Sequence, residues 1–518
     1  MKLFVKKPIQ QLLAASRETE KTLKRTLGVG SLIALGIGAI IGAGIFVRTA
    51  AAAGEHAGPA VTISFIIAAA GCALAGLCYA EFASMIPIAG SAYTYSYATM
   101  GELIAWIIGW DLVLEYALGA ATVSIGWSQY FNEFLNTFFN THIPFAWTHS
   151  PFETSITKTG MYAAEYGAHG IINLPAIFIL FLLSMLLIRG TAESAVVNNI
   201  IVVLKVAIVL MIIGLGWKFI NPANHTPYLI PANAGKVKVS TGVIDYSDTF
   251  NHGWLGVLRG ASVVFFAFIG FDAVSTAAQE AKNPQRDMPK GILISLVFCT
   301  ILYILFSHVL TGLASYKEFL IAGKEASVTY AISHYMPGYS WLASMVTVAI
   351  LAGFSSVILV MLLGQTRVFY TMSTDGLIPS VFSKLHPKHR TPYKSQWLFF
   401  GFVSLFAGFI PDRIVGDMVS IGTLFAFVLV CLGILILRRT DPDLIRPFRT
   451  PAYMIVCPLG AVICLCMIAS EGWENWARLF GWLIIGFIVY FGYSIKNSHV
   501  RKGVAEVVAD PPNPKYTE

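Results

Sequence analysis

The chain has 518 residues, of which 56% are hydrophobic and only 12% are charged. A soluble domain carries roughly 25% charged residues, so this composition excludes an ordinary soluble protein and predicts a chain that crosses a bilayer many times. The net charge of +7 is not a nucleic-acid signal, because the basic residues are spread over short segments between apolar runs.

Apolar runs of about 20 residues recur along nearly the whole chain, and each is long enough to cross the hydrocarbon core as a helix. The runs are rich in Leu, Ile, Phe, Ala and Gly and lack alternating polar and apolar pairs, which argues against a β-barrel. We therefore predict an all-α polytopic membrane protein. About twelve spans are expected near residues 29–53, 59–85, 102–131, 171–188, 196–219, 256–278, 291–313, 341–372, 396–409, 415–437, 452–470 and 476–495.

The basic residues predict the orientation of the chain. They precede the first span and follow the sixth, eighth, tenth and last spans, so they lie on one side if the spans alternate. The positive-inside rule then places both termini in the cytoplasm of a cell with the protein in its plasma or inner membrane. We expect a cytoplasmic segment at 1–27, one transmembrane domain at 28–495, and a cytoplasmic tail at 496–518. The outer loops 132–170 and 221–255 are expected to be irregular caps with short helices.

The first and sixth predicted spans are unusual in their glycines. The first contains ALGIGAIIGAGIF at 34–46, and the sixth contains FFAFIGFDAVST at 265–276 with Gly270 at its centre. Glycine costs about 1 kcal/mol relative to alanine inside a helix. Close helix packing is one explanation, since Gly38 and Gly42 form a small-xxx-small pair. A helix break is the other, and it is favoured because an inverted five-helix repeat puts spans one and six in equivalent places.

A broken helix exposes backbone groups that suit the head group of an amino acid. The freed amides at one half-helix attract a carboxylate, and the freed carbonyls at the other attract an ammonium group. The small side chains of Gly42, Ala43 and Gly44 would let a ligand approach the backbone closely. The rings of Phe266, Phe268 and Phe271 are expected either to wall such a site or simply to pack in the core.

Lys205 is the only charged residue in the middle of the fifth predicted span. A cation at that depth costs about 3 kcal/mol on insertion scales, so it tends to be kept for a purpose. Removal from water disfavours the ammonium form, which makes Lys205 a candidate proton switch. Glu115, near the middle of the third span and one turn after Asp111, has three open roles. We expect it to pair with Lys205, to bind a basic side chain of the substrate, or to form a structural ion pair with another residue.

Longer motifs carry a family resemblance over nearly the whole chain. They include GIGAIIGAGIFV at 36–47, GWDLVLEYALGAATVSIGWS at 109–128, FFAFIGFDAVSTAAQEAKNPQRDMP at 265–289 and RPFRTP at 446–451. With these motifs the sequence resembles amino acid permeases of the amino acid–polyamine–organocation superfamily, in particular bacterial homologues of the cationic amino acid transporters. The resemblance implies a LeuT-type 5+5 inverted repeat, with spans one and six unwound at mid-membrane. The repeats would cover about 28–220 and 253–437, and two extra helices would cover about 452–495.

The resemblance also implies a set of site residues. The substrate carboxylate would meet the amides of Gly42, Ala43 and Gly44, and the amine would meet carbonyls matching Ile40, Phe266, Ala267 and Ile269. Lys205 matches a lysine thought to replace a sodium ion as the proton carrier, so the proton is the expected coupling ion and no metal or other cofactor is expected. The chain departs from many relatives at Ala43, where Ser or Thr is usual, and at Gln279, where an acidic residue is usual.

We therefore expect proton-coupled symport of L-amino acids by alternating access. Ser355 and Ser356 in the eighth span are small and polar and, with Glu115, would leave room for a longer or cationic side chain, so a broad or cationic range is expected. The alternatives are an obligate amino acid exchanger and a non-transporting amino acid sensor. No nucleophile–base set or metal-ligand spacing predicts an enzyme. The expected partners are an amino acid and the lipid bilayer, not nucleic acid, and the question of a small single-span subunit is left open.

Overall fold

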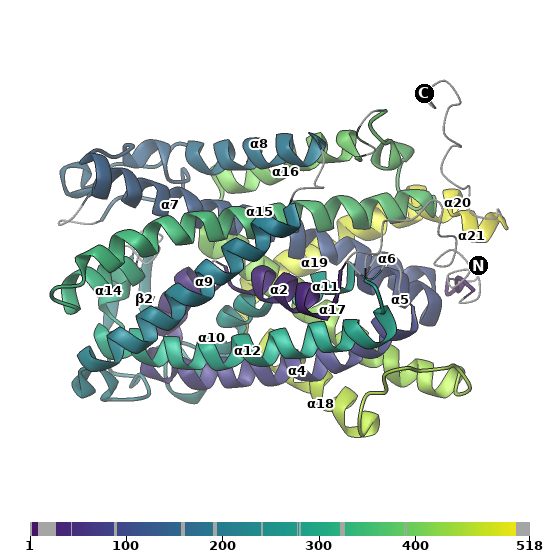
Figure 1. Ribbon diagram of the computed structural model, residues 1–518, viewed down its shortest axis with the longest axis horizontal. Coiled ribbons are helices and arrows are strands. Elements are labelled where there is room, and N and C mark those ends of the chain that lie inside the picture. The colour runs from purple at the N-terminus through teal and green to yellow at the C-terminus, as the bar shows by residue number, and fades with distance from the viewer. Residues whose placement is uncertain are drawn as a thin grey trace.

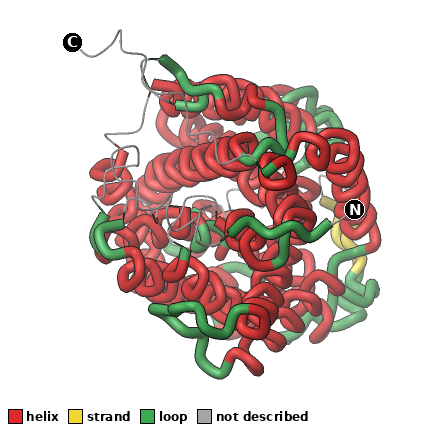
Figure 2. The backbone as a smooth tube through the Cα atoms, turned by 90° about the vertical axis from the view of Figure 1, so that its right-hand side faces the viewer, coloured by secondary structure: helices red, strands yellow, loops and turns green. Residues whose placement is uncertain are grey.

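The computed structural model describes residues 3–8, 27–42, 44–86, 91–156, 161–189, 194–239, 242–276, 278, 281–321, 327–387, 389 and 391–503. Long helices run side by side along the length of the molecule (Figure 1). Seen end-on, helices fill nearly the whole cross-section, with one small region of strand at its edge (Figure 2). Ala43, Gln279 and most of the predicted N-terminal segment and C-terminal tail lie outside the described residues.

Nine stretches of the described chain are long and apolar enough to span a bilayer. They are Val29–Met85, Glu102–Phe139, Asn199–Phe219, Gly253–Ser275, Pro284–Leu313, Ser340–Thr374, Asp412–Thr440, Tyr453–Ser470 and Trp473–Lys502. The first has 57 residues and contains two of the predicted spans. The predicted fourth and ninth spans are the helices α8 (Leu174–Arg189) and α16 (Tyr393–Phe409), which at 16 and 17 residues are shorter than the others. The prediction of a helical polytopic membrane protein is confirmed.

The first half of the chain runs from α2 to the short segments after α9. In order, it forms α2 (Val29–Ile40), η1 (Gly44–Arg48), α3 (Thr49–Ala52), η2 (Ala53–Ala57), η3 (Gly58–Ala60), α4 (Val61–Met85), α5 (Ser91–Thr99), α6 (Glu102–Val113), η4 (Leu114–Leu118), α7 (Gly119–Phe139), η5 (Phe145–Trp147), η6 (Ala163–Glu165), α8, α9 (Ser194–Gly216), η7 (Trp217–Phe219) and η8 (Pro222–His225).

The second half begins with a short hairpin and continues to the last described helix. In order, it forms β1 (Lys236–Val239), β2 (Gly242–Asp245), α10 (Gly253–Phe265), η9 (Phe266–Phe268), α11 (Ala273–Thr276), α12 (Pro284–Leu313), α13 (Glu318–Ile321), α14 (Ser327–Tyr335), α15 (Ser340–Thr374), η12 (Ser380–Ser383), α16, α17 (Asp412–Thr440), α18 (Tyr453–Ser470), α19 (Trp473–Val489), η13 (Tyr490–Ser494), α20 (Ile495–Asn497) and α21 (His499–Lys502).

Both glycine-rich segments interrupt their helices. α2 ends at Ile40, Ile41 is extended with φ −74° and ψ 100°, and the chain re-enters a helical conformation as the π-helical segment η1. α10 ends at Phe265 and passes through one 3₁₀ turn to an extended Ile269. Gly270 follows with φ +109°, a backbone conformation that glycine adopts at little cost and other residues resist. At each break, backbone amides and carbonyls therefore cannot form the hydrogen bonds that a continuous helix would give them.

The loop between α9 and α10 contains a β-hairpin where the sequence predicted only irregular structure and short helices. β1 pairs antiparallel with β2, placing Lys236 opposite Asp245, and these two side chains form an ion pair. Tyr246 follows the hairpin and donates a hydrogen bond of 2.6 Å from its hydroxyl to the carbonyl of Gly54. This bond fixes the loop against η2, between the first two predicted spans.

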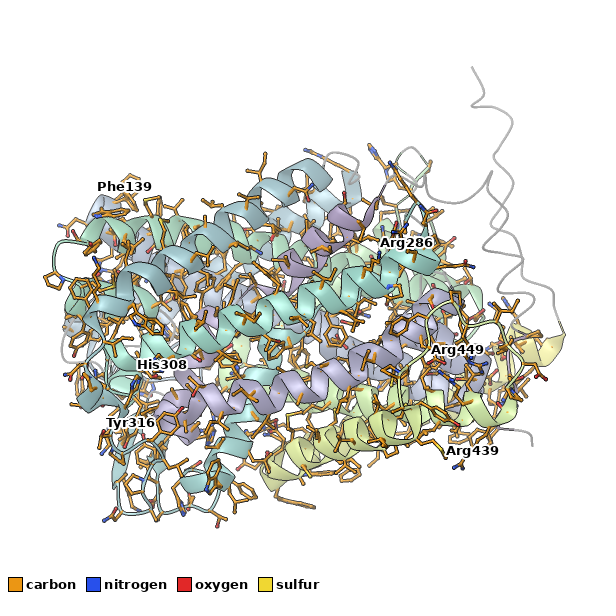
Figure 3. The ribbon with its side chains drawn as sticks, turned by 60° about the horizontal axis from the view of Figure 1, so that its bottom comes forward. Phe139, Arg286, His308, Tyr316, Arg439 and Arg449 are labelled. Carbon is orange, nitrogen blue, oxygen red and sulfur yellow. The ribbon has the colours of Figure 1, made fainter. Side chains whose placement is uncertain are left out.

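Basic residues gather at one end of the bundle. Arg286, Arg439 and Arg449 lie at that end, and Phe139, His308 and Tyr316 lie towards the opposite one (Figure 3). The C-terminal helices α20 and α21 lie at the basic end as well (Figure 1). These three arginines, which follow the sixth and tenth predicted spans, are therefore at one end of the molecule.

Candidate functional site

The two breaks meet at the centre of the bundle. A Cβ atom added to Gly44 would lie 2.1 Å from the Cα of Ala267, so no larger residue fits at position 44. A Cβ on Gly270 would lie 3.0 Å from Ala39, which shows that the second break also packs against the end of α2. Six predicted site residues lie in or next to the two breaks, and among them Gly44 and Ala267 are in contact: Ile40, Gly42, Gly44, Phe266, Ala267 and Ile269. Ala43, the seventh, lies outside the described residues.

Tyr303 of α12 connects the two breaks. Its hydroxyl oxygen lies 2.8 Å from the carbonyl oxygen of Ile40 and 2.9 Å from that of Ala267. A hydroxyl group has one hydrogen, so it can donate to only one of these carbonyls at a time. They are two of the carbonyls that the sequence analysis assigned to the substrate amine. The sequence analysis missed Tyr303, because its span contains several other polar residues and its partners lie in distant segments of the chain.

Lys205 reaches across from α9 to the end of α2. Its Nζ donates to the carbonyl oxygen of Gly38 at 3.0 Å, to that of Ile41 at 2.9 Å and to the hydroxyl of Ser356 at 2.9 Å. The side chain is buried, and three bonds use every donor of an ammonium group. Gly353 provides the space, because a Cβ there would lie 2.8 Å from the Cε of Lys205. The lysine therefore holds α2 next to its break and ties it to α9 and α15.

Glu115 does not pair with Lys205. It lies in the π-helical segment η4, and neither of its carboxyl oxygens has a hydrogen-bond donor in the described chain. The hydroxyl of Tyr116 donates to Asp272 Oδ2 at 2.6 Å. Both carboxyl groups are fully buried, and within the described chain no Lys, Arg or His forms an ion pair with either. The structural ion pair considered for Glu115 is thus not formed with any cation of the described chain.

The two serines of the eighth span form hydrogen bonds within their own helix, and one of them also binds Lys205. Ser356 donates to the carbonyl of Gly353 at 2.9 Å while it accepts from Lys205, and Ser355 donates to the carbonyl of Leu351 at 2.8 Å. Neither hydroxyl lines the cavity beside the second break. Apolar side chains of α15 line it instead, so the polar pocket wall expected here is absent from this cavity.

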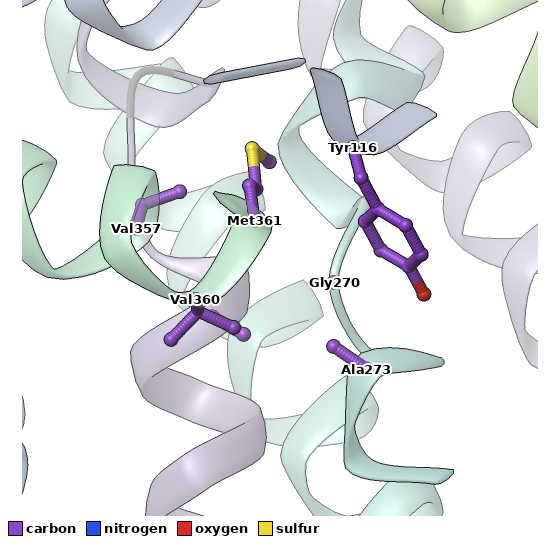
Figure 4. A pocket seen from close by; sticks show the side chains of 7 residues that line it. Tyr116, Gly270, Ala273, Val357, Val360 and Met361 are labelled. Atoms are coloured by element: carbon purple, nitrogen blue, oxygen red, sulfur yellow. The ribbon is translucent and has the colours of Figure 1, made fainter. Parts of the chain in front are cut away.

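That cavity measures about 10 Å³, which is roughly the space of one water molecule. Figure 4 shows its wall, with Tyr116 and Gly270 on one side and three α15 residues on the other. Its lining residues are Ala39, Tyr116, Gly270, Ala273, Val357, Val360 and Met361. An amino acid is many times larger than this volume, so admission of such a ligand requires the breaks and α15 to move apart.

A network of buried charges covers the breaks on the side of η1. Arg48 pairs with Asp412 at 3.3 Å and with Asp417 at 3.1 Å, and Arg259 pairs with Asp417 at 2.9 Å and with Glu471. The guanidinium carbon of Arg48 lies 5.9 Å from the ring centre of Phe266. This network joins the first break to α10, α17 and the turn between α18 and α19.

The other two phenylalanines of the sixth span pack in the core. The ring centre of Phe268 lies 5.3 Å from that of Tyr303, and the ring centre of Phe271 lies 5.7 Å from that of Tyr79. Their positions hold the second break against α4 and α12. Of the three aromatic residues considered for a wall, only Phe266 lies under the charge network.

Comparison with known proteins gives matches along nearly the whole chain. Residues 27–494 match the family model described as amino acid permease. The chain is 44% identical to the branched-chain amino acid permease BcaP of Bacillus subtilis (strain 168), over 96% of this chain and 99% of that protein. It is 40% identical to the methylthioribose transporter of the same organism, over 96% and 99%. It is 33% identical to cationic amino acid transporter 4 of Homo sapiens, over 81% of this chain and 60% of that protein.

Proposed function

Because the chain belongs to the amino acid permease family, and is thus a membrane transporter and not an enzyme, we propose that it carries L-amino acids together with protons by alternating access. Two broken helices in contact at Gly44 and Ala267 support an amino acid site, because each break turns backbone groups away from its own helix and the two breaks lie side by side. Lys205 is the residue that we propose to bind and release the coupled proton.

The finer architecture is part of the proposal. We assign the 5+5 inverted repeat to about 28–220 and 253–437, followed by α18 and α19 as extra helices, because the two breaks fall in the first and sixth spans of this division. We assign the basic end of the bundle to the cytoplasm of a bacterial-type plasma membrane. The gathering of Arg286, Arg439 and Arg449 at one end supports that orientation (Figure 3).

The observation that carries the coupling proposal is the set of three hydrogen bonds made by Lys205. An ammonium group has three N–H donors, and a neutral amine has two and gains an acceptor lone pair. Loss of the proton therefore weakens the attachment of α2 to α9 and α15 at the edge of the first break. A proton affinity that differs between outward and inward states then couples the proton to the substrate.

Gradient-driven uptake tests this function. The protein is reconstituted into liposomes, and uptake of labelled leucine is followed with an imposed gradient of pH, inside alkaline, and without one. We expect accumulation above the equilibrium level only with the gradient. Uptake that ignores the gradient and requires amino acid inside the liposomes would identify an exchanger instead, and binding without any uptake would identify a sensor.

The substrate is proposed to be a broad set of amino acids that includes apolar side chains. Val357, Val360 and Met361 make the α15 wall of the cavity apolar, and the similarity to a protein named as a branched-chain amino acid permease is in keeping with it. The proposal also includes substrates with a cationic side chain, because the carboxyl group of Glu115 could attract one. Competition of labelled leucine by alanine, arginine and methylthioribose separates these cases. Uptake of labelled methylthioribose without any uptake of labelled leucine would contradict an amino acid site, because that sugar lacks both a carboxylate and an ammonium group.

A further inference from the structure

We propose that a groove at the basic end of the molecule binds an anionic phospholipid of the inner leaflet. The groove has a volume of about 440 Å³, which is within the range of sites that hold small ligands. Its walls are the N-terminal segment 3–8, the turn from α5 to α6 and the C-terminal part of α17. The lipid site does not depend on the proposed transport function. Only its assignment to the inner leaflet rests on the proposed orientation.

The α17 wall of the groove is apolar and faces outwards. Leu429, Leu432 and Ile436 follow one another at spacings of three and four residues, so they lie on one face of the helix. Leu432 and Ile436 are 38% and 40% exposed, and they belong to a stretch long and apolar enough to span the bilayer. An exposed apolar face within a span contacts lipid, because no other apolar partner covers it. The chain of a lipid is therefore the ligand that fits this wall.

The N-terminal segment supplies the charged residue of the groove. The amide of Lys7 donates a hydrogen bond of 3.2 Å to the carbonyl oxygen of Tyr97 in α5, which anchors the segment. Lys7 is buried and Val5 is half-buried, whereas Phe4 and Lys6 are exposed. This alternation is that of an extended chain with one side against the protein. The other side, with Phe4 and Lys6, lines the groove.

Contacts on both sides of Lys6 hold the segment in this position. Gly101, between α5 and α6, has φ +96°, and a Cβ atom there would lie 2.7 Å from the carbonyl carbon of Phe4. Both the backbone conformation and the close approach therefore require glycine. On the other side, the Nζ atom of Lys7 forms an ion pair with Asp375 at 3.0 Å. The guanidinium group of Arg501 in α21 also donates to the carbonyl oxygen of Leu3 at 3.4 Å, and α21 lies at the basic end (Figure 1).

The charge of Lys6 is available to a ligand. Its side chain is exposed and forms no ion pair within the described chain. Thr440 also lines the groove, and its hydroxyl donates to the carboxylate of Asp441 at 2.6 Å. The exposed Arg439 offsets the charge of Asp441, so the positive charge of Lys6 remains uncompensated. Cations beside the cytoplasmic end of a span attract anionic lipid head groups, and an apolar wall next to the cation accommodates the lipid chain.

Native mass spectrometry of the full-length protein in detergent tests the lipid site. Protein depleted of lipid is titrated with phosphatidylglycerol, which is anionic, or with phosphatidylethanolamine of the same chains, which has no net charge. We expect the first phosphatidylglycerol to bind more tightly than phosphatidylethanolamine. We expect Lys6→Gln to weaken that binding about fivefold, the effect of one cation near a lipid head group.

Lys290→Gln is the matched control for the loss of charge. Lys290 is an exposed lysine four residues after Arg286, at the same end of the molecule, and it does not line the groove. We expect this control to bind phosphatidylglycerol as the wild type does. Equal binding of the two lipids by the wild type, or equal losses in the two variants, overturns the proposal.

A variant of the apolar wall tests the position of the lipid chain. Ile436→Trp places a large ring in the groove, whereas Ile484→Trp in α19 changes a residue that is 58% exposed and does not line it. We expect Ile436→Trp alone to lose the first phosphatidylglycerol at a concentration that saturates the wild type. Binding retained by Ile436→Trp would mean that the lipid lies elsewhere or that another part of the chain or a second copy covers the groove, and it would overturn the proposal.

Thermal unfolding keeps the proposal testable if Ile436→Trp does not fold. A ligand that binds the folded state raises the unfolding temperature. We expect phosphatidylglycerol to raise the unfolding temperature of the wild type and of Lys290→Gln more than that of Lys6→Gln. An equal increase in all three proteins would show that the lipid does not recognise Lys6.

Discussion

At the scale of single residues, Lys205 depends on a glycine for its position. A Cβ on Gly353 would lie 2.8 Å from Cε of the lysine, so Gly353→Ala forces the side chain away from α2. We expect a loss of about 1–3 kcal/mol of stability, typical of an overpacked site, together with loss of gradient-driven uptake. Thermal unfolding in detergent and uptake by liposomes measure the two effects.

The matched control for this change is Gly364→Ala in the same helix, α15. Its added Cβ would have its nearest neighbour at 3.6 Å, on Tyr116, which is ordinary van der Waals contact. Since alanine is favoured over glycine by about 1 kcal/mol inside a helix, the control is expected to be neutral or stabilising. Equal behaviour of the two variants would contradict the position assigned to Lys205.

The hydroxyl of Tyr303 gives a prediction about the substrate amine. Tyr303→Phe leaves the carbonyls of Ile40 and Ala267 without their donor, at a cost of about 1–3 kcal/mol for a buried acceptor. An ammonium group bound at these carbonyls would restore the missing hydrogen bonds. We therefore expect leucine to raise the unfolding temperature of the variant more than that of the wild type. A smaller increase would contradict the assignment of these carbonyls to the amine.

Some of these residues could be predicted from the sequence and others could not. Lys205, Gly44 and Gly270 are conspicuous because a charge or a glycine is costly where it occurs in a span. Tyr303 and Tyr116 are ordinary in their own helices. Their importance comes from contacts with residues that are distant in sequence. Tyr303, for example, contacts Ala267 at a sequence separation of 36, and helical periodicity contains no information about such partners.

At the scale of the elements, the contact between the two breaks is the critical interface. Gly44→Ala would place a methyl group 2.1 Å from the Cα of Ala267, and a backbone atom cannot move aside as a flexible side chain can. We expect this variant to lose leucine binding, measured with the purified protein at a ligand concentration that saturates the wild type. Gly30→Ala in α2 has open space around its Cβ and is the control. Full binding by Gly44→Ala would show that the breaks do not form the site.

The buried charge network leads to a prediction about the stability of the protein. Asp417→Asn removes the carboxylate shared by Arg48 and Arg259, leaving two buried cations with fewer partners. Breaking a buried ion pair in this way costs about 3–5 kcal/mol. Glu474→Gln is the control, because Glu474 is 84% exposed and its pair with Arg478 should contribute at most about 1 kcal/mol. Similar unfolding temperatures for both variants would contradict a structural role for the network.

Helices and strands were predicted best where hydropathy determines the secondary structure. They were predicted worst where contacts between side chains determine it. The long apolar runs predicted the helices, because a backbone in lipid must satisfy its own hydrogen bonds. The hairpin of β1 and β2 was not predicted, since its strands have four residues each and are held by the Lys236–Asp245 pair and the packing around Tyr246. The apolar α15 wall was also missed, because Ser355 and Ser356 turn their hydroxyls to backbone carbonyls of their own helix.

At the scale of the whole molecule, hydrogen bonds attach the two breaks to neighbouring helices and a charge network covers one side of them. Lys205 attaches the end of α2 to α9 and α15, and the hydrogen bond from Tyr116 to Asp272 joins η4 to the second break. The cavity beside the second break has a volume of about 10 Å³. Passage of an amino acid therefore requires the segments that carry the breaks to separate from α15 and η4, and that movement disturbs both attachments.

The central claim is that Lys205 couples the proton to the substrate. Lys205→Ala and the wild type are compared in liposomes by leucine uptake driven by a pH gradient and by counterflow exchange without one. The proposed mechanism predicts that the variant loses accumulation driven by the gradient and retains counterflow, because the substrate site on the breaks persists while the proton carrier is gone. Accumulation by Lys205→Ala equal to that of the wild type would contradict it.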